Sequence, residues 1–351
     1  MRIIFAGTPE FAVPSLRALA APGSGHDVLG VITREDVPLG RKRVLTPSPV
    51  ARAAEELGIP SHKANRLDDA ATEWARAKDP ELGVIVAYGG LVREPLLSLP
   101  ERGWINLHFS ELPRWRGAAP VQRALEAGEQ RLGVTAFRLV EALDAGDVLA
   151  RDSREFPFGT PAGEALATLA DFGTGALLRA VDALAADPDA GDPQIGEATY
   201  AHKLTREDGR LDLSRPAAEV LARWAGATPE PGAYALVGGR EDQPLKLHAV
   251  RPPGRSGSAG GSSPSDAARA INTGSGGQHA PFSSARSEID RANRGAERGA
   301  GSPGEVELVG GRAILHLEDG DLELVRVQPA GKAPMDGAAW LRGRGGSAVL
   351  A

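Results

Sequence analysis

Residues 1–19 read MRIIFAGTPEFAVPSLRAL, a stretch that indicates the fold class of the first part of the chain. The run at 2–6, RIIFA, is rich in β-branched and aromatic residues and is typical of a buried strand. Gly7 allows a tight turn after it, Thr8 is a good helix N-cap, and Pro9 suits the first helical position. Apolar residues then recur at helical spacing, at Ala12, Leu16 and Leu19. The stretch therefore predicts a buried strand that leads through a glycine turn into a helix.

The alternation of strands and helices continues through the first half of the chain. Apolar runs predict strands at 2–6, 27–33, 82–89, 103–110, 133–140 and 148–156. Ser48-Pro49 and Thr160-Pro161 each join an N-cap residue to a proline and predict helix starts, the second helix running through to residue 186. A polar loop is expected at 34–50. Strands that alternate with helices imply βαβ units, so we expect an α/β, mainly parallel sheet domain.

The last part of the chain has a different pattern of short alternating segments. These lie at 211–214, 233–237, 245–250, 305–309, 312–317 and 322–329. Close spacing of short strands predicts a small antiparallel β-barrel. A Gly/Ser/Pro/Arg-rich stretch at about 252–304 interrupts it, and its few large apolar residues cannot offset the entropy cost of ordering. We expect this stretch to be a disordered insertion in a barrel loop.

Length and composition agree with two globular domains. The chain has 351 residues, of which 42% are hydrophobic and 25% charged, as is usual for globular proteins. A Pro/Asp/Gly-rich stretch separates the two patterns. We expect domains at 1–186 and 205–351, joined by a linker at 187–204.

Composition also excludes several kinds of site. The chain has no cysteine, which excludes disulfides, thiolate nucleophiles and cysteine-based zinc sites. None of its 7 histidines forms an HxxxH pair, so we expect no metal. The formal net charge is −6, so any nucleic-acid contact must come from local basic patches.

The N-terminal apolar run stops at Gly7 and is too short for the core of a signal peptide. No stretch approaches the length needed to cross a bilayer. We therefore expect a cytoplasmic protein that makes no membrane contact.

Asn106 and His108 are the leading candidates for chemistry. They lie two residues apart on a predicted strand, so their side chains share one face. Taken alone, such a pair is more often a hydrogen-bonded part of a core. The strand leads into a Leu-Pro, Arg-Trp-Arg-Gly loop, however, and ligand sites in open α/β sheets lie beyond the carboxyl ends of strands.

A later loop, LDAGD at 143–147, supplies a carboxylate at Asp144. An amide, an imidazole and a carboxylate together suit the transfer of an acyl group to an amine. The amide can hold a developing oxyanion, the imidazole can move a proton, and the carboxylate can orient the imidazole. A covalent Ser-His-Asp mechanism is disfavoured because the chain has no GxSxG elbow. Nucleotide binding at Gly7-Thr8-Pro9 is also disfavoured, because no phosphate-binding glycine motif is present.

Seven segments resemble those of methionyl-tRNA formyltransferases and occur in the same order. They are MRIIFAGTPEFAVPSL (1–16), GRKRVLTPSPV (40–50), VAYGG (86–90), INLHFSELPRWRGAAPVQRAL (105–125), GVTAFRLVEALDAGDVL (133–149), TYAHKLTREDGRLDLS (199–214) and VQPAGKAPM (327–335). The resemblance spans nearly the whole chain except 252–304. The NxH and LDxGD motifs are shared by the wider 10-formyltetrahydrofolate-dependent formyltransferases, whereas the LPRWRGAAP, TYAHKL and QPAGK segments resemble the tRNA-acting branch.

The resemblance implies a Rossmann-like first domain that binds 10-formyltetrahydrofolate and an OB-like barrel that helps to hold tRNA. Asn106, His108 and Asp144 match the catalytic residues of the family. The implied folate-binding residues are Ser110, Leu112, Pro113, Val86, Tyr88 and Asp147. The expected tRNA-binding residues are Arg41, Lys42, Arg43, Arg114 and Arg116. Taken alone, the basic cluster at 41–43 is more often a solvated surface.

The expected reaction moves the formyl group of 10-formyltetrahydrofolate to the amine of initiator methionyl-tRNA, and we expect the protein to act as a monomer. Two alternatives remain open at this stage: a related enzyme that formylates a sugar amine or glycinamide ribotide, and a non-catalytic RNA-binding protein of the same fold. Phe109 and Glu111 depart from the family pattern, which usually has small or apolar residues there.

Overall fold

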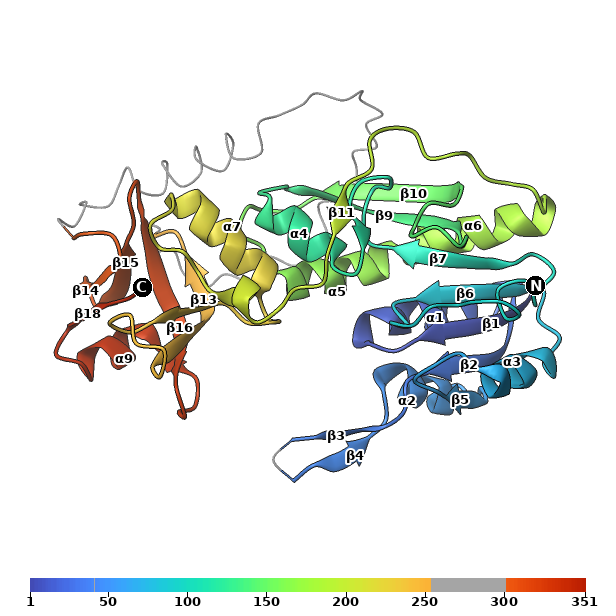
Figure 1. Cartoon of the computed structure of the whole chain (residues 1–351), viewed down its shortest axis with the longest axis horizontal. Helices are drawn as coiled ribbons and strands as arrows, with labels where there is room; N and C mark the ends of the chain where they lie inside the picture. Colours follow the sequence, from blue (N-terminus) through green and yellow to red (C-terminus); the bar gives the residue numbers. More distant parts are fainter. Residues whose placement is uncertain (41, 254–300) are drawn as a thin grey trace. The chain divides into compact units, whose positions relative to one another are not determined.

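The computed structural model describes residues 1–40, 42–253 and 301–351 (Figure 1). Arg41 and most of the expected insertion at 252–304 lie outside the described residues. The chain forms two compact units. The first comprises Met1–Ala124, Arg131–Phe156 and Gly163–Lys203, and the second Leu125–Gln130, Pro157–Ala162 and Leu204–Ala351.

A seven-stranded sheet in the order β10-β9-β7-β6-β1-β2-β5 forms the centre of the first unit. Its strands are β1 (Arg2–Gly7), β2 (Asp27–Thr33), β5 (Ser61–Lys63), β6 (Leu82–Val86), β7 (Trp104–His108), β9 (Arg131–Arg138) and β10 (Val148–Glu155). β5, β2, β1, β6 and β7 run parallel, whereas β9 and β10 are antiparallel to their neighbours. The predicted mainly parallel α/β sheet is confirmed.

Helices lie between and after these strands along the chain. They are α1 (Val13–Leu19), α2 (Pro49–Glu56), α3 (Asp69–Arg76), α4 (Pro120–Glu126), α5 (Ala162–Phe172) and α6 (Thr174–Ala186). Ala75 of α3 belongs to a buried cluster with Ile4, Ile32 and Trp104. The predicted Ser48 cap is confirmed, because its hydroxyl accepts a hydrogen bond from the N–H of Ala51 at 3.0 Å.

The predicted cap at Thr8 is wrong. A short 3-10 turn at Glu10–Ala12 comes first, and α1 begins at Val13 with a proline in its first turn. The Thr8 hydroxyl instead donates to the carbonyl of Tyr88 at 3.1 Å. Thr8 therefore joins the ends of β1 and β6, which are neighbouring strands.

The predicted single helix from Thr160 to residue 186 is two helices, α5 and α6, with Gly173 between them. A Cβ at Gly173 would lie 3.2 Å from Leu107 and 3.3 Å from Val134. Glycine lets the backbone approach the sheet closely at this point, and the helix breaks there.

The loop expected at 34–50 contains a small hairpin, β3 (Val37–Leu39) and β4 (Val44–Thr46). Its apolar side chains Val37, Leu39, Val44 and Leu45 are exposed. Two short parallel strands, β8 (Arg116–Gly117) and β11 (Tyr200–Ala201), also pair within the first unit.

The second unit contains an antiparallel sheet in the order β12-β13-β16-β15-β14-β18, with β17 paired to β16. The strands are β12 (Tyr234–Leu236), β13 (Pro244–Arg251), β14 (Glu305–Val309), β15 (Arg312–His316), β16 (Asp321–Pro329), β17 (Met335–Asp336) and β18 (Ser347–Val349). Hydrogen bonds between Leu236 and Ala351, at 2.6 and 2.8 Å, join the two ends of the sheet. The predicted antiparallel barrel is confirmed.

Two helices and one turn in the second unit differ from the prediction. α7 (Ala217–Ala227) and α9 (Gly337–Arg342) were not predicted. The strand predicted at 211–214 is absent from this described segment, because the Asp212 carboxylate accepts hydrogen bonds from the backbone and hydroxyl of Ser214 and folds a turn. In the part of the chain that the structure describes, no helix has the length and apolar character needed to cross a membrane.

Candidate active site

Asn106 and His108 lie on β7, a strand with neighbours on both sides. Asn106 is paired with Ile85 of β6 and Phe137 of β9, and His108 is paired with Thr135. β7 ends at His108, two residues earlier than predicted, so His108 lies at the carboxyl edge of the parallel strands. The predicted placement of both side chains on one face of a strand agrees with this spacing.

One hydrogen bond of the His108 ring defines its tautomer. Its Nε2 lies 2.9 Å from the carbonyl oxygen of Trp115, which can only accept, so Nε2 carries the hydrogen. Burial lowers the pKa of His108 below its usual value, against the opposing influences of the Asp144 carboxylate and the Trp115 carbonyl. The imidazole is therefore neutral near pH 7, and its Nδ1 presents a lone pair.

Asp144 lies in the loop that follows β9. Its Oδ2 lies 3.9 Å from Nδ1 of His108, with side chains 11% and 7% exposed respectively. The backbone N–H of Gly117 donates to the same oxygen at 2.7 Å. The structure thus brings two of the three predicted catalytic side chains together from separate loops and strands.

The Asn106 side chain is half-buried, and it makes no hydrogen bond to any residue that the structure describes. An amide in that state is available to a ligand, because leaving it unpaired in a closed site would cost free energy. Together with the His108 lone pair and the Asp144 carboxylate, the site offers a neutral donor, a base and a negative charge.

Three of the predicted folate-binding residues follow β7 directly. The Ser110 hydroxyl donates to the carbonyl of Arg114 at 2.6 Å, and the N–H of Leu112 donates to the Thr135 hydroxyl at 3.2 Å. Leu112 and Pro113 are buried. These bonds fold the chain after β7 into a tight turn beside His108.

The other three predicted folate-binding residues lie in two places. Val86 ends β6 and is buried, and Tyr88 follows it with its ring in the core and its hydroxyl bonded to the carbonyl of Ala64 at 2.6 Å. The buried Tyr88 ring is thus committed to packing, and its carbonyl to Thr8. Asp147 is exposed, in the same loop as Asp144.

The predicted basic residues fall into two groups, and Arg41 lies outside the described residues. Lys42 and Arg43 are exposed at the tip of the β3–β4 hairpin, which projects from the end of β2 (Figure 1). Arg114 lies over the Trp115 ring at 5.9 Å in the turn after β7. Arg116 donates to Gln194 at 2.6 Å, so its guanidinium is engaged within the protein.

The two residues that depart from the family pattern have structural partners. Phe109 packs edge-on against Phe11 at 5.4 Å, and Glu111 accepts a hydrogen bond from Arg131 at 2.9 Å. Both side chains are therefore engaged with residues other than His108. Gln194, by contrast, contacts the Asp144 loop and was not predicted, because it falls in the expected linker at 187–204.

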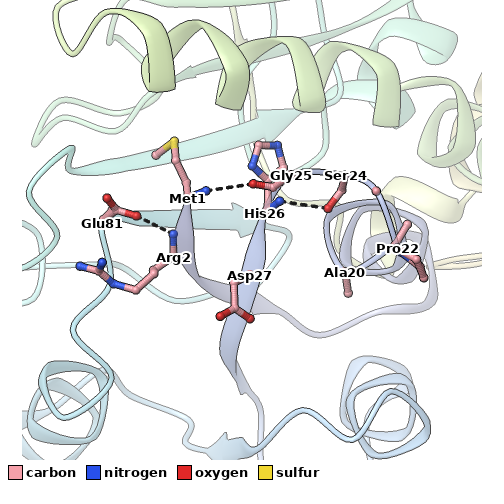
Figure 2. A pocket seen from close by; sticks show the side chains of 11 residues that line it. Met1, Arg2, Ala20, Pro22, Ser24, Gly25, His26, Asp27 and Glu81 are labelled. Carbon is pink, nitrogen blue, oxygen red and sulfur yellow. Dashed lines mark hydrogen bonds between the residues drawn. The ribbon is translucent and has the colours of Figure 1, made fainter.

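A separate pocket of about 440 Å³ is lined by Met1, Arg2, His26, Asp27 and Glu81, among others (Figure 2). These residues lie where β1, β2 and β6 begin. His108 lies where a parallel strand ends, so the pocket is at the opposite edge of the sheet. It contains none of the predicted site residues.

Comparisons with known proteins agree with this geometry. The family model "Formyl transferase" matches residues 1–181, and "Formyl transferase, C-terminal domain" matches 203–345. A methionyl-tRNA formyltransferase of Leifsonia xyli is 50% identical over 350 residues, covering 100% of both chains. The chain belongs to the methionyl-tRNA formyltransferase family. Family membership explains why the NxH strand, the LDAGD loop and the barrel occur in one chain.

Solved structures show that the fold is shared more widely than this family. HypX of Aquifex aeolicus, crystallised with tetrahydrofolic acid, matches with a TM-score of 0.60 and 16% identity, over 97% of this chain and 47% of that chain. A methionyl-tRNA formyltransferase of Clostridium thermocellum matches with a TM-score of 0.53 and 14% identity, over 72% of this chain and 93% of that one. At such low identity these matches establish the fold alone.

Proposed function

We propose that the chain transfers the formyl group of 10-formyltetrahydrofolate to the free amino group of initiator methionyl-tRNA and so supports translation initiation. The observation that carries the proposal is the arrangement at the end of β7. His108 is neutral, and its Nδ1 lies 3.9 Å from Oδ2 of the Asp144 carboxylate. The Asn106 amide, which has no hydrogen bond within the described residues, lies on the same strand as His108. Full-length identity of 50% to a methionyl-tRNA formyltransferase supports the choice of substrates.

Asn106 is proposed to stabilise the transition state. When the substrate amine attacks the formyl carbon, a carbon–nitrogen bond forms and the formyl oxygen becomes an oxyanion. The Asn106 side chain can donate its N–H to that oxygen, and loss of one such donor typically raises a barrier by roughly 2.7–4 kcal/mol. No described residue competes for this amide.

His108 and Asp144 are proposed to move the proton. A model α-amine has a pKa of about 7.7–8.0, so roughly a tenth to a sixth of it is already neutral near pH 7, and no strong base is needed to generate the nucleophile. After attack, the Nδ1 lone pair of His108 accepts the proton that the amine must lose. Asp144 stabilises the imidazolium so formed, which then returns the proton to the leaving folate nitrogen as its bond to the formyl carbon breaks.

The turn after β7 and the end of β6 are proposed to hold the folate, through Ser110, Leu112, Pro113, Val86 and Tyr88, with Asp147 nearby. The bound folate supplies the activated formyl group. Because the Tyr88 ring and hydroxyl are occupied in the core and its carbonyl accepts from Thr8, we assign to folate binding only the backbone N–H of Tyr88. HypX, which shares the fold, was crystallised with tetrahydrofolic acid.

The basic residues Lys42, Arg43 and Arg114, with Arg41, are proposed to contact tRNA phosphates. Exposed cations on a projecting hairpin suit a polyanion. We also propose that the chain has domains at 1–186 and 205–351. We propose in addition that it acts as a monomer and that it is located in the cytoplasm.

The test is a formylation assay with the purified chain. Incubation with 10-formyltetrahydrofolate and methionyl-initiator tRNA should yield formylmethionyl-tRNA, measured after mild hydrolysis of the ester. Parallel reactions should offer an amino sugar nucleotide and glycinamide ribotide as acceptors. Formylation of either small amine without formylation of the tRNA would overturn the proposal, as would tight tRNA binding with no turnover.

A further inference from the structure

The side chain of Gln194 joins the Asp144 loop to strand β8. Its amide nitrogen donates to two backbone carbonyls of that loop, those of Asp144 and Gly146, both at 2.8 Å. Its amide oxygen accepts from Nη2 of Arg116 at 2.6 Å. Both amide hydrogens and the oxygen are thus engaged, and all three bonds are partly buried.

The loop that Gln194 holds has an unfavourable backbone. Asp144 has φ +46, in the left-handed region that few non-glycine residues adopt. Gly146 lies so close to β9 that an added Cβ would be 1.9 Å from the carbonyl oxygen of Arg138. Such conformations persist only where the surroundings hold them, and Gln194 supplies bonds to the residues at both ends of this short turn.

The carboxylate itself accepts a hydrogen bond from the backbone N–H of Gly117 at 2.7 Å. Gly117 and Arg116 form β8, so Gln194 and Gly117 connect the same loop to the same short strand. One fixes the backbone of Asp144 and the other its side chain. The carboxylate held in this way lies 3.9 Å from Nδ1 of His108.

We propose that Gln194 is a positioning residue that sets the Asp144 carboxylate against His108 by bonding the backbone of the Asp144 loop. The inference rests on the proposed formyl transfer. It also gives Arg116 a role inside the protein, where it orients the Gln194 amide so that the nitrogen faces the loop carbonyls.

Two variants whose side chains resemble glutamine in shape distinguish the two bonds donated by the Gln194 amide nitrogen from the bond accepted by its oxygen. Gln194→Glu keeps an acceptor for Arg116 but replaces the donor with an oxygen that repels the two carbonyls. Gln194→Met removes both kinds of bond. Gln243→Glu, in a turn of the second unit, is the matched control for the added charge, because the Gln243 side chain has no hydrogen bond within the described residues.

Steady-state formylation should show both Gln194 variants losing about 10- to 100-fold in kcat, since small misplacements of a catalytic group cost on that order. KM for both substrates should stay within about twofold of the wild-type value, because Gln194 is proposed to position the reacting groups and not to bind either substrate. Gln243→Glu should match the wild type. Turnover within about twofold in both variants would overturn the inference. Full activity in Gln194→Glu with loss in Gln194→Met would overturn it too, because only the Arg116 bond would then matter.

A substrate-free measurement separates this inference from the proposed reaction. NMR titration of His108 should give a lower pKa in Gln194→Met than in the wild type, because the Asp144 charge that raises this pKa would no longer be held nearby. An unchanged His108 pKa would refute the positioning role even if formylation occurs. If the wild type forms no formylmethionine but the His108 pKa is still lower in Gln194→Met than in the wild type, the reaction is refuted and the positioning role stands.

Discussion

Nδ1 of His108 lies 3.9 Å from Oδ2 of Asp144, too far for a hydrogen bond, while Nε2 of the same ring is bonded to the Trp115 carbonyl. A neutral ring held in this way turns a lone pair toward a carboxylate. Neither group can donate to the other. The gap therefore suits a group that carries protons, such as the amine that the formyl group is transferred to.

Replacing Asn106 by alanine should cut turnover about 100-fold or more, because one oxyanion donor is lost. KM should change little if the amide acts mainly in the transition state. Steady-state kinetics of formylation measure both constants. Asn65→Ala is the control, since it removes an exposed amide whose partner is Glu35. Near-normal turnover in Asn106→Ala would rule out the proposed role.

Replacing Asp144 by asparagine should lower the pKa of His108 further. Burial already lowers this pKa and the Asp144 charge opposes the shift, so removing the charge removes the opposition. Asparagine keeps an oxygen that can accept from Gly117, so the loop should stay in place. NMR titration of the ring checks the direction. A rise in the His108 pKa would contradict the described geometry.

Stability should fall as the pH drops below about 6.5, the usual histidine value. The pKa of His108 is lowered in the folded state, so between the two values the unfolded chain binds more protons. The free energy of folding that neutral His108 contributes is therefore complete above the His108 pKa of the unfolded chain. It is lost as the pH falls toward the His108 pKa of the folded chain. Chemical denaturation at several pH values should show a smaller loss for His108→Gln. An equal or larger loss in that variant would contradict the prediction.

Gly83→Ala should destabilise the fold by about 1–3 kcal/mol through overpacking. An added Cβ would lie 2.1 Å from the ring of Trp104, which is buried and bonded through its N–H to the Leu96 carbonyl at 2.8 Å. Gly175→Ala in α6 is the control, because its nearest neighbour is a flexible arginine end at 3.5 Å. Helix propensity makes that control neutral or stabilising by up to about 1 kcal/mol. Denaturation curves that show Gly175→Ala to be less stable than Gly83→Ala would contradict the prediction.

Affinity for methionyl-tRNA should fall steeply with salt, since phosphate contacts release counterions. Arg43→Ala at the hairpin tip should weaken binding and reduce the slope of log K against log salt by about 1. Lys78→Ala is the control, because Lys78 lies over the Trp74 ring at 5.4 Å. Binding measured at several salt concentrations gives the slopes. Equal slopes for Arg43→Ala and the wild type would remove Arg43 from the proposed interface.

The sequence alone determined the local features of this protein. Strand runs such as 2–6 and the Ser48-Pro49 helix start are set by β-branched residues, proline geometry and capping, which act between near neighbours in the chain. The spacing of Asn106 and His108 also fixed their shared face, because side chains alternate along a strand. The LDAGD motif, through its resemblance to known formyltransferases, was enough to indicate Asp144 as a site residue.

Only the tertiary structure decided which distant groups meet. Gln194 lies 50 positions after Asp144 in an irregular segment, so no local pattern could show that its side chain bonds the Asp144 loop. Gly173 lies close to Leu107 and Val134 of the neighbouring sheet, and the Thr8 hydroxyl donates to Tyr88, which follows a strand far along the chain. The neutral state of His108 and its tautomer likewise come from burial and from the Trp115 carbonyl. Hydrogen bonds and burial between remote segments appear only when the chain has folded, and these contacts set the geometry of the site.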